Sequence, residues 1–416
     1  MKMSGIVLSA SVRQNLLSLQ STAELLSTTQ SRLATGNKVN SALDNPTNFF
    51  TAQGLNNRAS DINNLLDSIG NGVQVLQAAN TGITSLQKLV DTAKSIANQV
   101  LQAPTGYTVK ASATSLAPTG AGPLAVAGTA ADLTNAGTNS LQAKTFIFTP
   151  ATGAATTITI SNVVAAGNVN SIDSFNAALT SAGLGLSAAL ASDGSITLTS
   201  TNDNASQTLT TGTTAAANTV AISGTDTATL VTPTGGSAGK PVADAASQAI
   251  RASLVNQYNN IITQISTTAQ DSSFNGINLL FGDNLKLTFD ETGKSTLNVT
   301  GVTYDAAGLG LGSLTSGTDF LDNSSANKAL TLLSSASTVL RTEASALGSN
   351  LSVVQLRQDF NKSLINVLQT GASNLTLADS NEEAANSQAL STRQSIAVSA
   401  LALANQSQQG VLQLLR

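Results

Sequence analysis

The chain has 416 residues and contains no His, Cys or Trp. These absences remove the His general base, the thiol nucleophile and Cys/His metal ligation, so we expect neither an enzyme nor a bound cofactor or metal. With 19 basic against 23 acidic residues, the net charge of −4 provides no basic surface for nucleic acid or a membrane. We also expect no cleaved signal peptide and no membrane span, because no sufficiently long apolar run occurs.

Residues 1–45 predict a terminal helix with a heptad seam. Apolar residues alternate spacings of four and three, which is typical of coiled coils. The predicted seam consists of Val12, Leu16, Leu19, Ala23, Leu26 and Leu33. Asn45 and Pro46 should end this segment, because the residue before a proline is disfavoured in a helix.

A second, much longer helix is predicted within residues 46–103. Its apolar seam runs from Leu55 to Val100 and shifts register once, after Ile83. At 1.5 Å of rise per residue this helix would be about 70 Å long, which indicates a rod.

The centre of the chain, residues 104–241, differs from both flanks. It holds six of the seven prolines and neither Arg nor Glu, and Thr, Ala, Ser and Gly dominate it. Because proline breaks helices, we predict a separate β-rich module.

The helical pattern returns in residues 242–379. One helix should end near Asp271, a β-hairpin should cover residues 285–300, and a second long helix should follow. The predicted seam of that helix continues through Leu356, Phe360, Leu364 and Val367.

Residues 380–416 are again heptad-spaced, at Leu390, Ala397, Leu401, Ala404, Val411 and Leu415. The two arms can bury their seams by packing together. The predicted fold is therefore mainly α, a long antiparallel helical rod with one β-hairpin, carrying an α+β insert. We expect three domains: 1–45 with 380–416 as a terminal coiled-coil domain, 46–103 with 242–379 as the rod, and 104–241 as the insert.

Several segments resemble bacterial flagellins. In the N-terminal arm these are residues 31–36 (SRLATG), 39–42 (VNSA), 44–46 (DNP) and 67–79 (DSIGNGVQVLQAA). In the C-terminal arm they are residues 274–280 (FNGINLL), 374–380 (NLTLADS), 402–406 (ALANQ) and 411–416 (VLQLLR). The motif residues carried over are Asn40, Ser41, Asp44, Asn275, Gly276, Leu414, Leu415 and Arg416.

This resemblance implies a structural subunit of the extracellular flagellar filament, the propeller for swimming. It also implies that residues 104–241 form an exposed, variable domain, with strands near residues 145–149, 156–161, 185–191 and 195–200 and a helix around 171–182. It further implies export in an unfolded state by the flagellar type III system, and assembly through coiled-coil packing of the two terminal seams. The implied partners are other copies of the chain, alone or mixed with other flagellins, together with an export chaperone, the filament cap and hook-associated proteins.

One departure from the family concerns recognition by Toll-like receptor 5. Many flagellins carry an arginine-rich patch on the rod helix that this receptor recognises. The matching positions in this chain include Gln87, Lys88, Val90 and Asp91. Val90 stands where the key arginine would be, so we expect weak or no recognition by this receptor.

Two other functions remain open. A hook-filament junction protein shares the terminal heptads, although the large insert and the ending Leu414, Leu415 and Arg416 favour a flagellin. An adhesin would use the Thr-rich insert for glycan binding, but only 3% of the residues are aromatic, which disfavours sugar stacking.

Overall fold

The computed structural model describes residues 10–115, 132–134, 141–163, 165–191, 194–224 and 239–414. They form two units. Unit 1 consists of the described residues up to Gln74, of Lys286–Asn298, and of the described residues from Leu351 onward. Unit 2 consists of the described residues within Val75–Leu285 and within Val299–Asn350. The borders at Gln74 and Leu351 fall inside long helices, so this division differs from the three domains expected above. The three-domain division stays a prediction.

Unit 1 contains helix α1 (Ala10–Thr35), the first part of α2 (Pro46–Gln102), the last part of α5 (Asn323–Thr376) and α6 (Ser380–Leu414). The predicted break at Asn45 and Pro46 is confirmed. Pro46 occupies the first position of α2, where a missing N–H costs no hydrogen bond. The side-chain oxygen of Asn45 accepts a hydrogen bond from the Asn48 N–H at 3.0 Å, which caps the helix.

The α2 and α5 segments of unit 1 share an apolar core. It consists of Ala59, Ile62, Ile365 and Leu368, with Leu55, Leu66 and Leu364 packed against it. The predicted hairpin is confirmed as strands β11 (Leu285–Thr288) and β12 (Thr296–Val299), which pair with each other.

Three contacts join the hairpin to the two helices. Asn361 of α5 is buried and donates to the backbone oxygen of Phe289 at 2.9 Å. The Arg357 guanidinium lies 6.0 Å from the centre of the Phe289 ring. Arg58 of α2 forms an ion pair with Glu291 at 2.6 Å. The hairpin is therefore tied to both helices of unit 1.

The predicted seam of α5 is wrong in its last part. Leu356, Phe360 and Val367 are exposed, and Leu356 keeps 71% of its surface. Val354 is buried and Leu364 packs against the core, as predicted, but the rest of the buried stripe runs through Asn361, Ile365, Leu368 and Ala372. The polar Asn361 interrupts the apolar pattern on the buried side, which made the outward-facing residues look like the seam.

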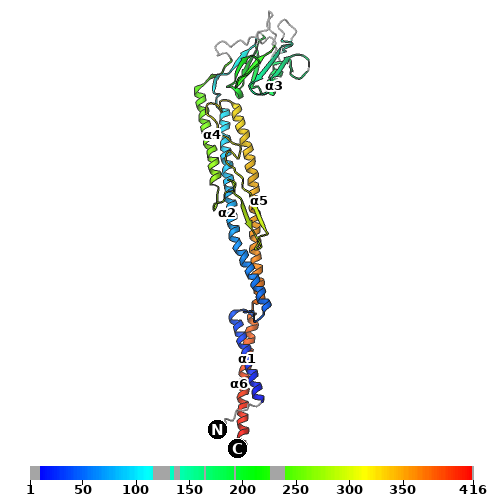
Figure 1. Ribbon diagram of the computed structural model, residues 1–416, viewed down its shortest axis with the longest axis vertical. Helices are drawn as coiled ribbons and strands as arrows, with labels where there is room; N and C mark the ends of the chain where they lie inside the picture. The colour runs from blue at the N-terminus through cyan, green and yellow to red at the C-terminus, as the bar shows by residue number, and fades with distance from the viewer. Residues whose placement is uncertain are drawn as a thin grey trace. The chain divides into compact units, whose positions relative to one another are not determined.

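Unit 2 contains α4 (Ala245–Asp271), which ends at the predicted residue. Figure 1 shows α4 alongside the last part of α2 and the first part of α5. The predicted seam of α2 is confirmed here, because its members have no exposed surface: Leu76, Ile83, Leu86, Val90, Ala93, Ala97 and Val100.

The insert belongs to unit 2 and is β-rich, as predicted. A five-stranded sheet has the order β5 (Asn168–Val169), β4 (Thr156–Ile160), β3 (Thr145–Pro150), β9 (Thr219–Ser223) and β8 (Thr208–Thr211). A three-stranded sheet has the order β2 (Ser112–Thr114), β7 (Ile196–Ser200) and β6 (Leu186–Leu190). Strands β1 (Tyr107–Val109) and β10 (Val242–Ala243) pair where the chain enters and leaves the insert. Strands β3, β4, β6 and β7 confirm the four expected ones.

Helix α3 (Ile172–Ser181) confirms the helix expected in the insert. Ser171 caps it, with its hydroxyl accepting from the Ser174 N–H and the Ser174 hydroxyl accepting in return from the Ser171 N–H. Phe175 packs edge-on against Phe146 and Phe148, with ring centres 5.3 and 6.3 Å apart. A small aromatic cluster therefore fixes α3 on the sheet.

Two glycines of α2, Gly82 in unit 2 and the control Gly54 in unit 1, make a matched test of packing. A Cβ at Gly82 would overlap Ser272 and would come within 2.7 Å of Leu280, whereas a Cβ at Gly54 meets nothing within 4 Å. We expect Gly82→Ala to destabilise the protein by about 1–3 kcal/mol through overpacking. Gly54→Ala should stabilise it by about 0.5–1 kcal/mol through helix propensity. Thermal unfolding of both variants checks this, and equal shifts would contradict the packing at Gly82.

Candidate assembly surface

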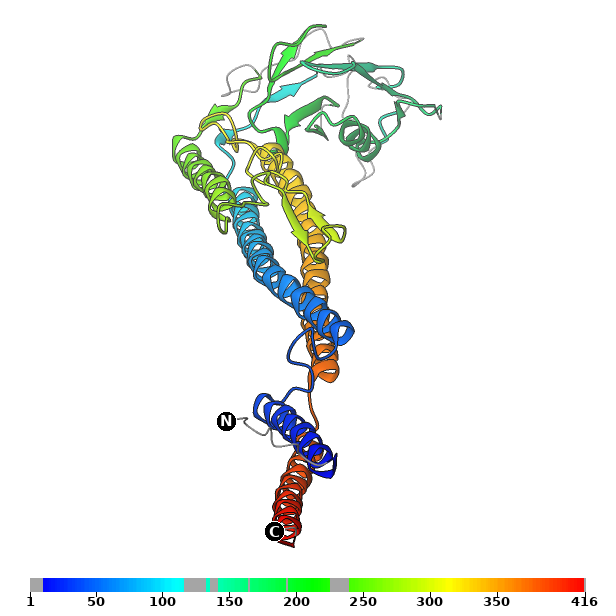
Figure 2. The same ribbon diagram turned by 60° about the horizontal axis from the view of Figure 1, so that its bottom comes forward.

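The two terminal helices, α1 and α6, pack side by side and antiparallel in unit 1 (Figures 1 and 2). Buried and half-buried residues repeat every three or four positions on each helix, as in a coiled coil. On α1 they are Val12, Asn15, Leu19, Thr22, Leu26 and Thr29; on α6 they are Glu383, Ser387, Leu390, Gln394, Ala397, Leu401 and Ala404. The seam within the chain therefore mixes apolar and polar side chains.

One ion pair sets the register of this helix pair. Arg32, near the end of α1, contacts Glu383, in the first turn of α6, at 3.3 Å. Glu383 is buried, so this pair is better shielded than a fully exposed one. Asp379 precedes α6, and its carboxylate accepts the Asn381 N–H at 2.9 Å, which caps the helix.

The two connections next to this helix pair bond to each other. The Lys38 N–H donates to the Thr376 backbone oxygen at 2.7 Å, and the Ala378 N–H donates to the Gly36 oxygen at 2.9 Å. An isolated bridge joins Asn37 and Leu377. The connection between α1 and α2 is therefore hydrogen-bonded to the connection between α5 and α6.

The motif residues Asn40, Ser41 and Asp44 lie in this connection. The Asp44 carboxylate accepts the N–H groups of Asn40 and Ser41, both at 2.9 Å, and the Ser41 hydroxyl at 3.1 Å. These hydrogen bonds, that from Asn40 first, hold the pKa of Asp44 below its usual value. The motif residues therefore stabilise the conformation of this connection.

The second motif pair, Asn275 and Gly276, forms a tight turn in unit 2. Both residues have positive φ, 50° and 80°, and Phe274 and Ile277 exchange two backbone hydrogen bonds of 3.0 Å. Asn-Gly suits such a turn because both residues tolerate this backbone conformation. This motif too has a structural explanation.

Apolar side chains remain on the outer faces of the terminal helices. They are Leu16, Leu17, Leu25 and Leu33 on α1, and Ile396, Val398 and Leu403 on α6. A groove of about 340 Å³ also lies between the two helices, lined among others by Leu25, Ala389, Leu390 and Arg393. An apolar surface of this kind is typical of an interaction site.

The predicted assembly residues divide between the inner seam and these outer faces. Val12 is buried, and Leu19, Ala23, Leu26, Leu390, Ala397, Leu401 and Ala404 are half-buried, whereas Leu16 and Leu33 are exposed. The side chains of Val411 and Leu414, and all of Leu415 and Arg416, lie outside the described residues. The heptad template did not select Leu17, Leu25, Ile396 and Leu403, because it follows only one stripe of each helix.

The residues matched to the receptor patch do not form one surface. Val90 has no exposed area and belongs to the core of unit 2, Gln87 is half-buried, and Lys88 and Asp91 are exposed. Position 90 therefore cannot present a side chain to a partner.

A buried arginine joins three helices at the base of the insert. Arg251 of α4 has no exposed surface. It donates to the backbone oxygens of Pro104 and Phe320, both at 2.7 Å, to that of Ala103 at 3.0 Å and to the Asn323 side chain at 3.1 Å. Burial lowers the pKa of Arg251, and the nearby Asp322 opposes that shift.

Asp322, next to the start of α5, binds Ser206 of the insert. Its carboxylate accepts the Ser206 N–H at 2.7 Å and also the Ser206 hydroxyl. Burial raises the pKa of Asp322, although these hydrogen bonds and Arg251 act in the other direction. Neither Arg251 nor Asp322 stands out in the sequence, since their partners lie far along the chain.

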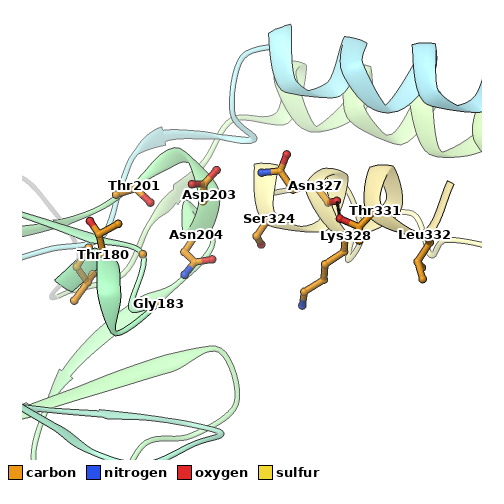
Figure 3. A pocket seen from close by; sticks show the side chains of 12 residues that line it. Thr180, Gly183, Thr201, Asp203, Asn204, Ser324, Asn327, Lys328, Thr331 and Leu332 are labelled. Carbon is orange, nitrogen blue, oxygen red and sulfur yellow. Dashed lines mark hydrogen bonds between the residues drawn. The ribbon is translucent and has the colours of Figure 1, made fainter. Parts of the chain in front are cut away.

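An open pocket of about 700 Å³ lies beside this junction (Figure 3). Figure 3 shows Asp203 and Lys328 pointing to different sides, so the two charges do not converge on one ligand. No group of three potential metal-ligating residues occurs in the part of the chain that the structure describes. None of its described helices is long and apolar enough to cross a membrane.

Comparison with known proteins identifies both arms. The bacterial flagellin N-terminal helical region matches residues 7–118, and the bacterial flagellin C-terminal helical region matches residues 330–415. Flagellin FljM of Caulobacter vibrioides is 32% identical over 167 residues, which are 39% of this chain and 59% of that protein. Flagellin A of Rhizobium meliloti is 39% identical over 79 residues, which are 19% of this chain and 20% of that protein.

The match thus spans 59% of the length of the Caulobacter relative. The N-terminal match covers α1 and α2, and the C-terminal match covers most of α5 and all of α6. The β-rich insert, α4 and the hairpin lie mostly or entirely between the two matches. The chain therefore belongs to the bacterial flagellin family.

Proposed function

We propose that this chain is a structural subunit that polymerises into the flagellar filament, the propeller for swimming. The observation that carries the proposal is the apolar outer surface of α1 and α6, the helices within the matched flagellin regions. In a single copy the inner seam holds the two helices together and leaves seven large apolar side chains exposed among the residues described there. Neighbouring copies would cover them, and an open polymer needs such contacts to repeat without closing.

A sedimentation assay tests this function. Purified full-length chain brought to salting-out conditions is expected to move from the supernatant to the pellet, because excluded salts strengthen apolar association. Dilution into low salt should leave the pelleted material assembled, which separates a polymer from a precipitate. A chain that stays in the supernatant would favour the hook-filament junction or adhesin alternatives.

We further propose that the chain acts outside the cell without enzymatic activity, after unfolded export by the flagellar type III system. Sparse charge and the lack of Cys support passage as an unfolded thread, because no disulfide can trap it. Its partners would be other copies, alone or mixed with other flagellins, and the export chaperone, filament cap and hook-associated proteins.

Weak or absent recognition by Toll-like receptor 5 is expected as well. Val90 occupies the position of the key family arginine and has no exposed surface. Purified monomer should give little signal in a receptor reporter assay, and strong signalling would contradict this. Val90→Arg should not restore recognition, since its guanidinium would enter the core and destabilise unit 2.

A further inference from the structure

The three-stranded sheet of the insert ends at β6, so one side of this strand has no neighbouring strand. Gly185 and Ala191, which flank β6, both form backbone hydrogen bonds with residues that flank β7. Successive residues of an antiparallel strand turn their N–H and C=O groups to opposite sides. The residues of β6 that turn these groups to the open side are therefore Leu186, Ala188 and Leu190.

Charged side chains do not protect this edge. An open edge is a template for a strand from another molecule, and proteins commonly block it with charges. No charged residue occurs between Asp173 and Asp193, and β6 itself reads Leu-Ser-Ala-Ala-Leu. Uncharged strands of this kind pair readily with copies of themselves. The edge of β6 therefore needs another form of protection.

Asn176 of α3 occupies the middle of the open edge. Its Oδ1 accepts the Ala188 N–H at 2.6 Å, and its Nδ2 donates to the Ala188 backbone oxygen at 3.0 Å. Two directly opposed residues of an antiparallel pair exchange the same two kinds of bond. A single side-chain amide thus replaces one residue of a missing neighbouring strand.

The core of the insert fixes this amide in place. Helix α3, labelled in Figure 1, packs against β6. Phe175 and Leu179, on either side of Asn176, have no exposed surface and belong to the same core cluster as Leu186 and Ala188. Neighbouring strands lie about 4.8 Å apart, so the Asn176 side chain lies in the space that a fourth strand would occupy.

The outer strand β8 of the five-stranded sheet shows a similar arrangement. The Leu209 N–H, on the side away from β9, donates to the Gly239 backbone oxygen at 2.8 Å. Gly239 has a φ of 64°, and a Cβ there would overlap the Leu209 oxygen. At both edges a backbone N–H that points away from the sheet is bonded to another part of the same chain.

We propose that Asn176 closes the edge of β6 against strand addition by β6 of a second copy. Without this amide, the open sides of two β6 strands can pair antiparallel and join two inserts in one continuous sheet. Contacts of this kind would compete with any ordered assembly of the chain. The inference concerns the insert and is independent of the filament function proposed for α1 and α6.

The variant Asn176→Leu tests the inference, because leucine has a similar size but neither a donor nor an acceptor. At low salt, the apparent dissociation constant for self-association, measured by analytical ultracentrifugation, is expected to fall roughly tenfold or more relative to the wild type. The control Ala177→Leu adds a leucine at an exposed position of α3 and should behave like the wild type. Adding Ala189→Lys to Asn176→Leu should restore the monomer, since a charged edge resists strand pairing.

Hydrogen exchange of the Ala188 amide gives a second measurement, which needs no variant. In the wild type this amide should exchange as slowly as one paired within a sheet, although it lies at a sheet edge. Fast exchange there would overturn the inference. So would a folded Asn176→Leu that associates no more than the wild type, or a double variant that associates as strongly as the single one. Sedimentation of the wild type under salting-out conditions tests the filament function separately, so the two proposals can fail independently.

Discussion

Replacing Arg251 with methionine is expected to destabilise unit 2 by about 3–5 kcal/mol, the range for breaking a buried charged network from one side. Arg251 is completely buried and satisfies four acceptors. Two of them, the oxygens of Ala103 and Pro104, directly follow the end of α2 at Gln102, where the helix dipole favours a cation. Methionine fills similar space but leaves these acceptors without donors.

Thermal unfolding followed by circular dichroism measures the effect, and the melting temperature should fall by roughly 10 °C. Arg251→Lys is the matched control for charge. Lysine keeps the cation but lacks the planar guanidinium that reaches both the end of α2 and the start of α5, so we expect it to recover only a small part of the loss. A change below about 1 kcal/mol in Arg251→Met would contradict the assigned role.

Removing residues 380–416 is expected to abolish polymerisation and leave unit 2 folded. The truncation takes away α6, so the inner seam of α1 loses its cover and the outer stripe of α6 disappears. Unit 2 contains no residue of this segment. Sedimentation under salting-out conditions measures the first effect, and the melting temperature of the truncated chain measures the second.

The truncated chain also allows a mixing experiment. Added to the full-length chain, it should not enter the pellet in proportion to its share, because it lacks one helix of the assembling pair. Normal filaments built from the truncated chain alone would refute the role of α6.

The sequence predicted well those elements whose burial follows a regular pattern. The seam of α2 consists of Ala, Leu, Ile and Val, so spacing alone located residues such as Leu76, Ile83 and Val100 in the core. Pro46 and the Asn-Gly turn at residues 275 and 276 act locally, through φ preferences that do not depend on distant contacts. The break after α1 and the turn after α4 could therefore be predicted.

Prediction failed where polar residues are buried and apolar residues are exposed. Thr22 and Thr29 lie in the inner seam of α1, whereas Leu16 and Leu33 face outward. Asn361 similarly occupies the buried side of α5 because the oxygen of Phe289 needs a donor. A heptad count selects the apolar stripe in each case. If the subunit assembles with other copies, the stripe that is buried within one chain can differ from this apolar stripe.

The junction at the base of the insert could not be predicted at all. Arg251 lies 147 residues from Pro104 and 69 from Phe320, and Asp322 lies 116 from Ser206. No local pattern links such positions, and the acceptors of Arg251 are mostly backbone oxygens, which every residue has. Only the folded chain brings them together.

Electron microscopy of the purified full-length chain under salting-out conditions tests the central claim most directly. If the outer faces of α1 and α6 are contacts between copies, the images will show long helical filaments of uniform width. Dispersed monomers, or aggregates without helical order, would contradict assembly through the terminal helices.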